Sequence, residues 1–118
     1  CIAAYRYNTW EEAVAIANAN LNVEGKGHSV CIHSYNDAHI DYAAETLPVS
    51  RFLINQICST NNGGSFFNSL SATTTLGCGS WGNNSISDNL TYQHLMNTTK
   101  LAYYHPSSLP SDEEVWAE

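Results

Sequence analysis

Histidine is the side chain in this sequence best suited to acid–base chemistry near neutral pH, and His28 has the most suggestive neighbours. It lies between the Gly25–Gly27 break and an apolar run, where glycine lets the backbone bring a side chain close to a ligand. An imidazole with an ordinary pKa of about 6.5 can take up or release a proton at neutral pH. The alternative is a histidine held at the start of a strand by backbone hydrogen bonds. Four further histidines are expected to be exposed or structural: His33, His39, His94 and His105.

Cysteine thiols are the candidate nucleophiles and metal ligands. The sequence has four of them, Cys1, Cys31, Cys58 and Cys78, and their wide spacing favours reduced thiols over two disulfides. Cys78 stands between two glycines, but no nearby cation would stabilise its thiolate, so a packed thiol is favoured over a reactive one. Neither C-x-x-C nor H-x-x-H spacing occurs, and no metal site is predicted.

Residues 56–90 form the segment in which we expect a site. Serine, threonine, asparagine and glycine dominate it, and neither a period of 2 nor one of 3.6 persists. A long irregular segment inside a compact domain usually builds a site or an interface. Neither helix nor strand periodicity predicts that Phe66 and Phe67 are buried in this segment. We therefore expect them either to contact a ligand or to anchor the loop on the core. The glycines of the 77–82 segment indicate close backbone approach to a ligand or, equally, a tight packed turn.

The elements that must position these residues are predicted in residues 1–55, as strand, helix, strand, helix, strand. The three predicted strands are residues 2–7, 29–34 and 51–55. Thr9 is predicted to cap the first helix, with Glu12 reaching back to the Thr9 N–H. Asn36 is predicted to cap the second helix, which ends before Pro48. Five apolar residues share one face of the first helix by their spacing: Trp10, Ala13, Val14, Ala17 and Leu21.

This order of elements predicts an α/β fold of parallel strands with crossover helices, both on one face of a sequentially ordered sheet. Residues 91–105 are predicted to hold a short helix at 91–96 and an oligomerisation-type strand at 98–104. Residues 106–118 are expected to be an acidic tail. The edge strands of such a sheet have unpaired backbone N–H and C=O groups. These unpaired edges are unfavourable in an isolated domain and are expected in a part of a larger α/β protein.

Composition excludes several classes of partner. The 118 residues are 43% apolar and carry a net charge of −7, with only four lysines and arginines, so no nucleic-acid surface is expected. No apolar run approaches the roughly 18 to 20 residues of a membrane span, and no secretory signal is recognisable. Because the sequence starts at Cys1 inside an apolar run, we expect it to be a fragment.

Several segments together resemble the CoA-acylating aldehyde dehydrogenases. They are Gly27-His28-Ser29, residues 50–56 (SRFLINQ), residues 64–68 (GSFFN) and, most tellingly, residues 73–87 (TTTLGCGSWGNNSIS). The last segment looks like a signature shared with the aldehyde dehydrogenase half of bifunctional aldehyde-alcohol dehydrogenases. The likeness covers essentially the whole chain. Residues 89–92 and the short acidic tail look closest to the acylating enzymes for succinate semialdehyde or sulfoacetaldehyde.

The resemblance implies an oxidoreductase that converts an aldehyde, CoA and NAD+ or NADP+ into acyl-CoA and NAD(P)H. A cysteine thiolate attacks the aldehyde, a hydride passes to the nicotinamide, and CoA takes the acyl group from the enzyme thioester. In the family, both the nucleophile and the dinucleotide-binding domain precede the region matched here. The fragment alone is therefore expected to be inactive, and the full-length protein to be a cytoplasmic homo-oligomer.

The resemblance also assigns candidate site residues. His28 matches a histidine that assists acyl transfer, as a base for the CoA thiol. Phe66, Phe67 and Asn68 match the approach to the acyl channel. Close approach to the thioester or the CoA arm is implied for three consecutive residues: Gly77, Cys78 and Gly79.

Two interpretations from other classes remain open at this point. The chain could be a small α/β binding or oligomerisation module without catalysis, because a C-terminal strand is suited to pairing with a neighbouring subunit. It could also be a secreted glycoprotein, which would require all four cysteines to be paired.

Overall fold

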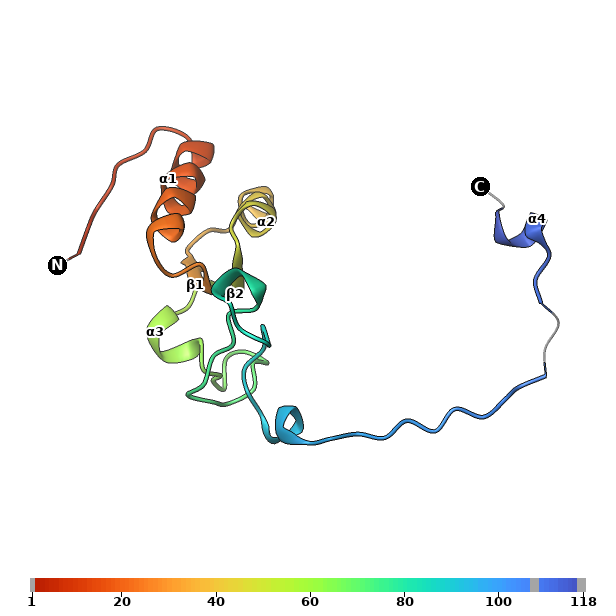
Figure 1. The fold of residues 1–118 in the computed structure, drawn as a ribbon. Coiled ribbons are helices and arrows are strands. Elements are labelled where there is room, and N and C mark those ends of the chain that lie inside the picture. The colour runs from red at the N-terminus through yellow and green to blue at the C-terminus, as the bar shows by residue number, and fades with distance from the viewer. Residues whose placement is uncertain (1, 107–108, 117–118) are drawn as a thin grey trace.

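The computed structural model describes residues 2–106 and 109–116, and the predicted acidic tail lies partly outside this range (Figure 1). The first half of the chain alternates helices with strands, whereas the described part of the second half contains single helical turns. The elements in chain order are α1 (Trp10–Val23), β1 (Gly27–Ile32), α2 (Asp37–Thr46), β2 (Val49–Ile54), α3 (Cys58–Asn61), the 3-10 helices η1 (Ser80–Gly82) and η2 (Tyr92–Leu95), and α4 (Asp112–Val115).

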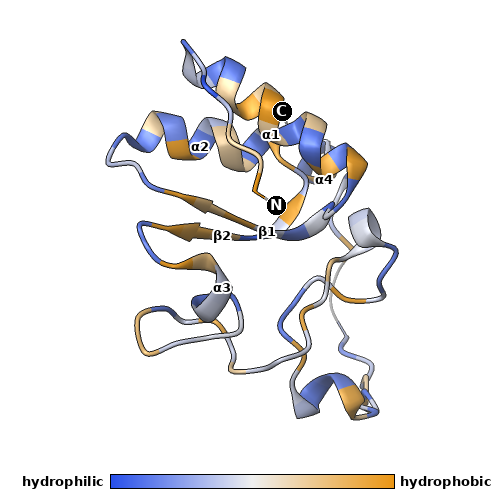
Figure 2. Ribbon diagram, turned by 90° about the vertical axis from the view of Figure 1, so that its left-hand side faces the viewer, coloured by the Kyte–Doolittle hydropathy of each residue, from blue (hydrophilic) through white to orange (hydrophobic). Residues whose placement is uncertain are grey.

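The two strands pair in parallel, as predicted, and α2 makes the crossover between them. Gly27 is opposite Val49 and Ile32 is opposite Ile54. Both long helices cover one face of this sheet, and the irregular segment that follows β2 covers the other (Figure 2). The prediction of an α/β fold with both helices on one face is confirmed. Each strand begins two residues earlier than the sequence pattern indicated.

The apolar core lies between the helices and the sheet. Val14 of α1, Ile32 of β1, and Ala43 and Leu47 of the α2 region form its buried cluster. Along β2 the side chains alternate, so Phe52 and Ile54 pack toward this cluster. Val49, Arg51 and Leu53 point to the opposite face, and all three are buried. A sheet buried on both faces is typical of parallel α/β proteins, and the loop side is therefore a second packed layer.

Helix capping follows the prediction with one change. The Thr9 hydroxyl accepts a hydrogen bond from the Glu12 N–H at 3.2 Å, and Asn36 Oδ1 accepts one from the Ala38 N–H at 3.1 Å. Glu12, however, does not complete the predicted box with Thr9. Its carboxylate accepts from the Asn8 N–H at 2.7 Å, one residue earlier, because the chain before the helix bends back there. The N-terminus of α1 is thus capped by two side chains.

Two predicted strands are absent from the described residues. Residues 2–7 and 98–104 are extended but form no ladder, because no other strand lies beside either segment. Side chains in both are exposed, such as Ile2 at 97% and Tyr103 at 86%. The radius of gyration is 20.0 Å, against about 13 Å for a compact chain of this length, since both end segments leave the body (Figure 1). The predicted short helix at 91–96 is present as η2.

The helices of the described residues are all too short or too polar to cross a membrane.

Candidate functional site

A buried arginine organises the loop side of the sheet. Arg51 lies in the middle of β2, is 4% exposed, and uses all five of its N–H groups as donors. Nε donates to Ser29 Oγ at 3.2 Å on the neighbouring strand. The two terminal nitrogens donate to His28 O at 3.2 Å, Gly77 O at 2.6 Å, Ser87 O at 3.2 Å and Asn89 Oδ1 at 3.4 Å. The Arg51 side chain therefore holds together β1, the loop at Gly77 and residues 87–89.

The Arg51 cation is balanced by neutral oxygens. Among the described residues, no carboxylate lies within ion-pair distance of its guanidinium, and the acceptors are three carbonyls, a hydroxyl and an amide oxygen. Buried charges are tolerated when hydrogen bonds satisfy them. Since every N–H is used inside the protein, we interpret Arg51 as an anchor of the loops and not as a ligand-binding cation.

Asn89 is the second buried polar anchor, with 6% of its surface exposed. Its Nδ2 donates to Asn62 O at 3.1 Å and to Ser71 O at 2.8 Å, while its Oδ1 accepts from Arg51. Leu76 and Asn89 also form an isolated antiparallel bridge. Asn89 thus joins three separate parts of the loop layer, and Arg51 joins that layer to the sheet.

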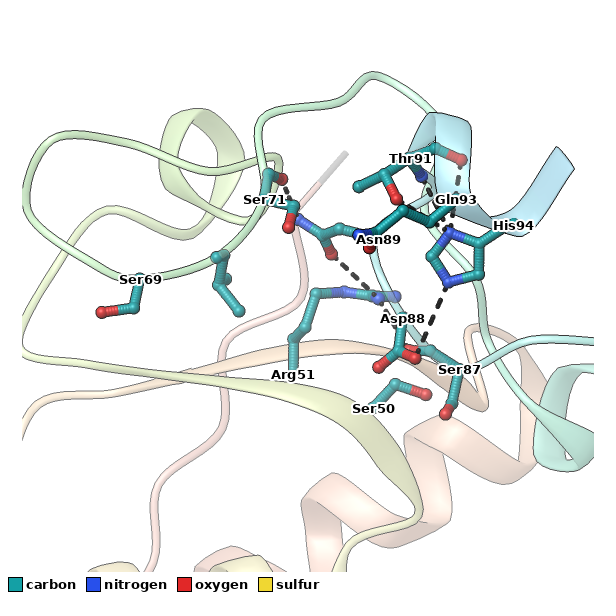
Figure 3. Close-up of a pocket in the computed structure, with 11 residues that line it drawn as sticks. Ser50, Arg51, Ser69, Ser71, Ser87, Asp88, Asn89, Thr91, Gln93 and His94 are labelled. Atoms are coloured by element: carbon teal, nitrogen blue, oxygen red, sulfur yellow. Dashed lines mark hydrogen bonds and ion pairs between the residues drawn. The ribbon is translucent and has the colours of Figure 1, made fainter. Parts of the chain in front are cut away.

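A polar hollow of about 360 Å³ opens beside these two anchors (Figure 3). Thr91 N–H donates to His94 Nδ1 at 3.0 Å, so the neutral ring carries its proton on Nε2, which lies 3.9 Å from Asp88 Oδ2. The Ser50 hydroxyl is buried and has no hydrogen-bond partner. Hydroxyl and amide side chains predominate in the lining: Ser50, Arg51, Ser69, Leu70, Ser71, Ser87, Asp88, Asn89, Thr91, Gln93 and His94.

His28, the predicted base, lies at the start of β1 with an exposed side chain. Its Nδ1 is 3.0 Å from Ser29 Oγ, and that hydroxyl also accepts from Arg51 Nε. A hydroxyl oxygen has two lone pairs, so it can accept from both groups when Nδ1 carries the histidine proton. In that tautomer Nε2 is the unprotonated atom. The arrangement is compatible with a base, and also with a histidine held at the start of a strand.

The predicted site residues Gly77, Cys78 and Gly79 are close to His28 through the backbone. Gly27 has a φ of +86°, and a Cβ on it would collide with the Cys78 carbonyl oxygen. Gly77 N–H donates to Asp88 O at 3.0 Å and Gly79 N–H to Ile86 O at 2.8 Å. Because these N–H groups are already bonded, the contacts favour a packed turn over a backbone cradle for a ligand.

The other predicted substrate residues lie apart from this cluster. Phe66 and Phe67 are both exposed, at 106% and 85%. Asn68 is used within its own loop: Nδ2 donates to Gln56 Oε1 at 3.0 Å and to Asn61 O at 3.1 Å. The structure therefore brings His28 together with residues 77–79, but not with residues 66–68.

Sequence reasoning missed Arg51, Asn89 and the Ser50 hydroxyl. A signal existed for Arg51, since it is one of four cations in the chain and interrupts an otherwise apolar strand. Charged residues are almost never fully buried without partners, so a cation inside such a strand predicts a buried hydrogen-bond network. No comparable signal marks Asn89 in a segment rich in asparagine.

Comparison with known proteins agrees with this architecture. No protein-family model matches the chain. It is 53% identical over 116 residues to the succinate-semialdehyde dehydrogenase (acetylating) of Clostridium kluyveri, covering 98% of the chain and 25% of that protein. It is 38% identical over 117 residues to the sulfoacetaldehyde dehydrogenase of an Acholeplasma species, covering 99% of the chain and 24% of that protein. The crystal structure of a probable aldehyde dehydrogenase from Listeria monocytogenes superposes with a TM-score of 0.79 at 33% identity, covering 94% of the chain and 23% of that protein.

The fold is therefore that of a part of an aldehyde dehydrogenase catalytic domain. Within that class, the chain belongs to the family of acylating aldehyde dehydrogenases, to which it is similar over almost its whole length. The chain spans about a quarter of the length of the curated relatives named above.

Proposed function

We propose that the chain is the C-terminal part of a CoA-acylating aldehyde dehydrogenase. The full-length protein would convert a short aldehyde, with succinate semialdehyde the first candidate, together with CoA and NAD(P)+ into acyl-CoA and NAD(P)H in the cytoplasm. Similarity over 98% of the chain to a succinate-semialdehyde dehydrogenase (acetylating) carries this proposal. The nucleophilic cysteine and the dinucleotide-binding domain would lie outside these 118 residues, so the chain by itself would be inactive.

His28 would act in the second half-reaction, in which CoA takes the acyl group from the enzyme thioester. A thiol with a pKa of about 8.5 is mostly protonated at neutral pH, and a nearby imidazole speeds its attack by accepting the proton. The contacts of His28 support this role, since Nδ1–H can donate to Ser29 Oγ and leave Nε2 to meet the thiol. Arg51 would hold the same serine in place.

The test separates the two half-reactions in the full-length enzyme. His28→Ala should leave the first burst of NAD(P)H nearly unchanged, because hydride transfer precedes CoA attack. Steady-state CoA-dependent turnover should fall about 100-fold, at the lower end of what a positioned base contributes. His39→Gln is the matched control, because His39 lies on α2 and stacks on Trp10 with ring centroids 4.8 Å apart. Unchanged steady-state turnover in His28→Ala would remove His28 from the mechanism.

We also propose that residues 98–104 pair with a second subunit in the full-length protein. This extended segment leaves the body and exposes large side chains, including Leu101 at 78% and Tyr104 at 88%. Its backbone N–H and C=O groups can add a strand to the edge of a neighbouring sheet. Replacing Leu101 and Tyr103 by lysine should shift sedimentation toward monomer, and an unchanged oligomer would exclude this contact.

A further inference from the structure

The face of β1 that points to the loop layer carries a thiol with two polar neighbours. Cys31 Sγ lies 2.8 Å from the carbonyl oxygen of Gln56 and 3.4 Å from His33 Nε2. The thiol is only partly buried, and the His33 side chain is exposed. In the resting protein the thiol donates its proton to the carbonyl. The imidazole is close enough to accept that proton when an oxidant approaches, and a thiolate is the reactive form of cysteine.

A second thiol begins the next element. Cys58 is the first residue of α3, which packs against β1, and it follows by two positions the residue whose carbonyl contacts Cys31. It is partly buried and free, as Cys31 is. Burial raises the pKa of the Cys58 thiol, and Cys31 raises it further, while Arg51 opposes both. The contact between Cys31 Sγ and the Gln56 carbonyl places the Cys31 thiol beside the turn that leads into α3, two residues before Cys58.

Metal binding is the other chemistry that such a cluster suggests. Among the described residues, no three His, Cys, Asp or Glu side chains converge as metal ligands. A thiolate, a nearby base and a second thiol are instead the components of reversible disulfide chemistry.

We propose that Cys31 and Cys58 form a redox-modifiable thiol pair, with Cys31 as the attacking thiol, His33 as its base, Cys58 as the resolving thiol and a hydroperoxide as oxidant. His33 takes the Cys31 proton and the thiolate sulfur attacks the peroxide oxygen. The O–O bond breaks, and the leaving oxygen departs as water or alcohol with that proton, giving a sulfenic acid. The Cys58 sulfur then displaces the hydroxyl as water and the S–S bond forms. Two thiols are oxidised and one hydroperoxide is reduced.

The position of the pair gives this oxidation a structural consequence. The disulfide would fasten the start of α3 to the end of β1. Asn61 of α3 bonds to Gln56 through Nδ2 at 3.1 Å, and Asn68 bonds to both residues. Through these contacts the oxidised pair would constrain the loop that carries Phe66 and Phe67. This proposal does not depend on the role of His28.

Peptide mapping of the intact protein after hydrogen peroxide treatment tests the pair. Trypsin cleaves after Lys26 and Arg51 and isolates Cys31, while chymotryptic cleavage after Phe67 separates Cys58 from Cys78. We expect a reducible peptide pair that joins Cys31 to Cys58. Cys58→Ser should instead yield a Cys31 sulfenic acid that reacts with a dione probe, whereas Cys78→Ser should behave as wild type. Circular dichroism establishes that each variant is folded.

The role of His33 as the base is tested by the rate of disulfide formation. His33→Gln should slow disulfide formation about tenfold, since a partly solvated contact contributes less than an enclosed general base. Three results would each overturn the proposal. They are a wild-type protein in which Cys31 goes to sulfinic acid without pairing, a disulfide that joins Cys31 to a different cysteine, and a His33→Gln rate equal to wild type.

Discussion

The two layers on either side of the sheet are held by different forces. The helical layer packs Val14, Ile32, Ala43 and Leu47 into a continuous apolar cluster, whose stability comes from removing hydrocarbon from water. The loop layer has no such cluster and is joined to the sheet by the hydrogen bonds of Arg51. Apolar packing tolerates small changes of shape, whereas a buried polar network loses stability sharply when one member is removed. The predicted site residues 66–68 and 77–79 lie in this loop layer, and His28 lies on β1 beside it.

Among the substitutions considered, removal of the Arg51 cation should lower the free energy of unfolding most. Arg51→Leu leaves five acceptors without their donor, and because each unsatisfied buried acceptor costs about 1–3 kcal/mol, we expect the free energy of unfolding to fall by about 3–5 kcal/mol in total. Arg6→Leu is the matched control, because Arg6 is exposed and should change stability by less than about 0.5 kcal/mol. Urea unfolding in the intact protein measures both. Equal stability of the two variants would show that hydrogen bonds do not hold the loop layer.

Leu53→Ala tests the place where the two layers meet. Leu53 is fully buried, and deletion of its side chain should lower the free energy of unfolding by about 2–4 kcal/mol. Leu109→Ala, at a position 93% exposed, should leave stability within about 0.5 kcal/mol of wild type. If Leu53→Ala exceeded Arg51→Leu in effect, apolar contact and not the arginine would be the main attachment of the loops.

A pair of glycines tests the contact between β1 and the 77–82 turn. Gly27 and Gly25 both have positive φ values, +86° and +92°, so alanine is strained at either position. At Gly27 the new Cβ also meets the Cys78 carbonyl, whereas at Gly25 the nearest atom is Leu21 Cδ2 at 3.9 Å. Gly27→Ala should therefore be less stable than Gly25→Ala by about 1–3 kcal/mol in thermal unfolding. Equal melting temperatures would mean that the turn moves aside at little cost.

The smallest loss of unfolding free energy is expected from removal of the N-terminal cap of α1. Thr9→Ala removes the hydroxyl that accepts from the Glu12 N–H and should cost about 1 kcal/mol in chemical unfolding. Glu12 continues to accept from the Asn8 N–H, which keeps the loss small. Since the cap belongs to the helical layer alone, amide exchange in residues 77–89 should stay unchanged. Faster exchange there would show that the two layers are not independent.

The same contrast explains how much could be predicted from the sequence. The helical layer follows from local rules: the caps at Thr9 and Asn36 and the apolar periodicity of α1 each involve residues a few positions apart. The loop layer depends on pairs that are distant in the sequence, such as Arg51 with Gly77 and Asn89 with Asn62. Neither the apolar periodicity nor the secondary-structure propensities of the sequence predict contacts between such distant residues. The resemblance predicted the family, but not the arginine that holds His28 and Gly77 through their carbonyl oxygens.

The segments predicted as strands at 2–7 and 98–104 form no ladder within the described residues, for a related reason. Alternation of apolar and polar residues reports that a segment suits a sheet, and not that a partner strand lies beside it. In both segments the described chain offers no partner. The pattern at residues 98–104 therefore indicates a surface that can pair, which is the basis of the proposed subunit contact.

Amide hydrogen exchange at Gly77 and Gly79 tests most directly whether Arg51 holds the loop layer. Their N–H groups donate to Asp88 O at 3.0 Å and Ile86 O at 2.8 Å, so protection reports an intact turn. In conditions where the protein stays folded, Arg51→Leu should accelerate exchange at both amides and leave the central amides of α1 protected. Unchanged protection at Gly77 and Gly79 in that variant would contradict the account.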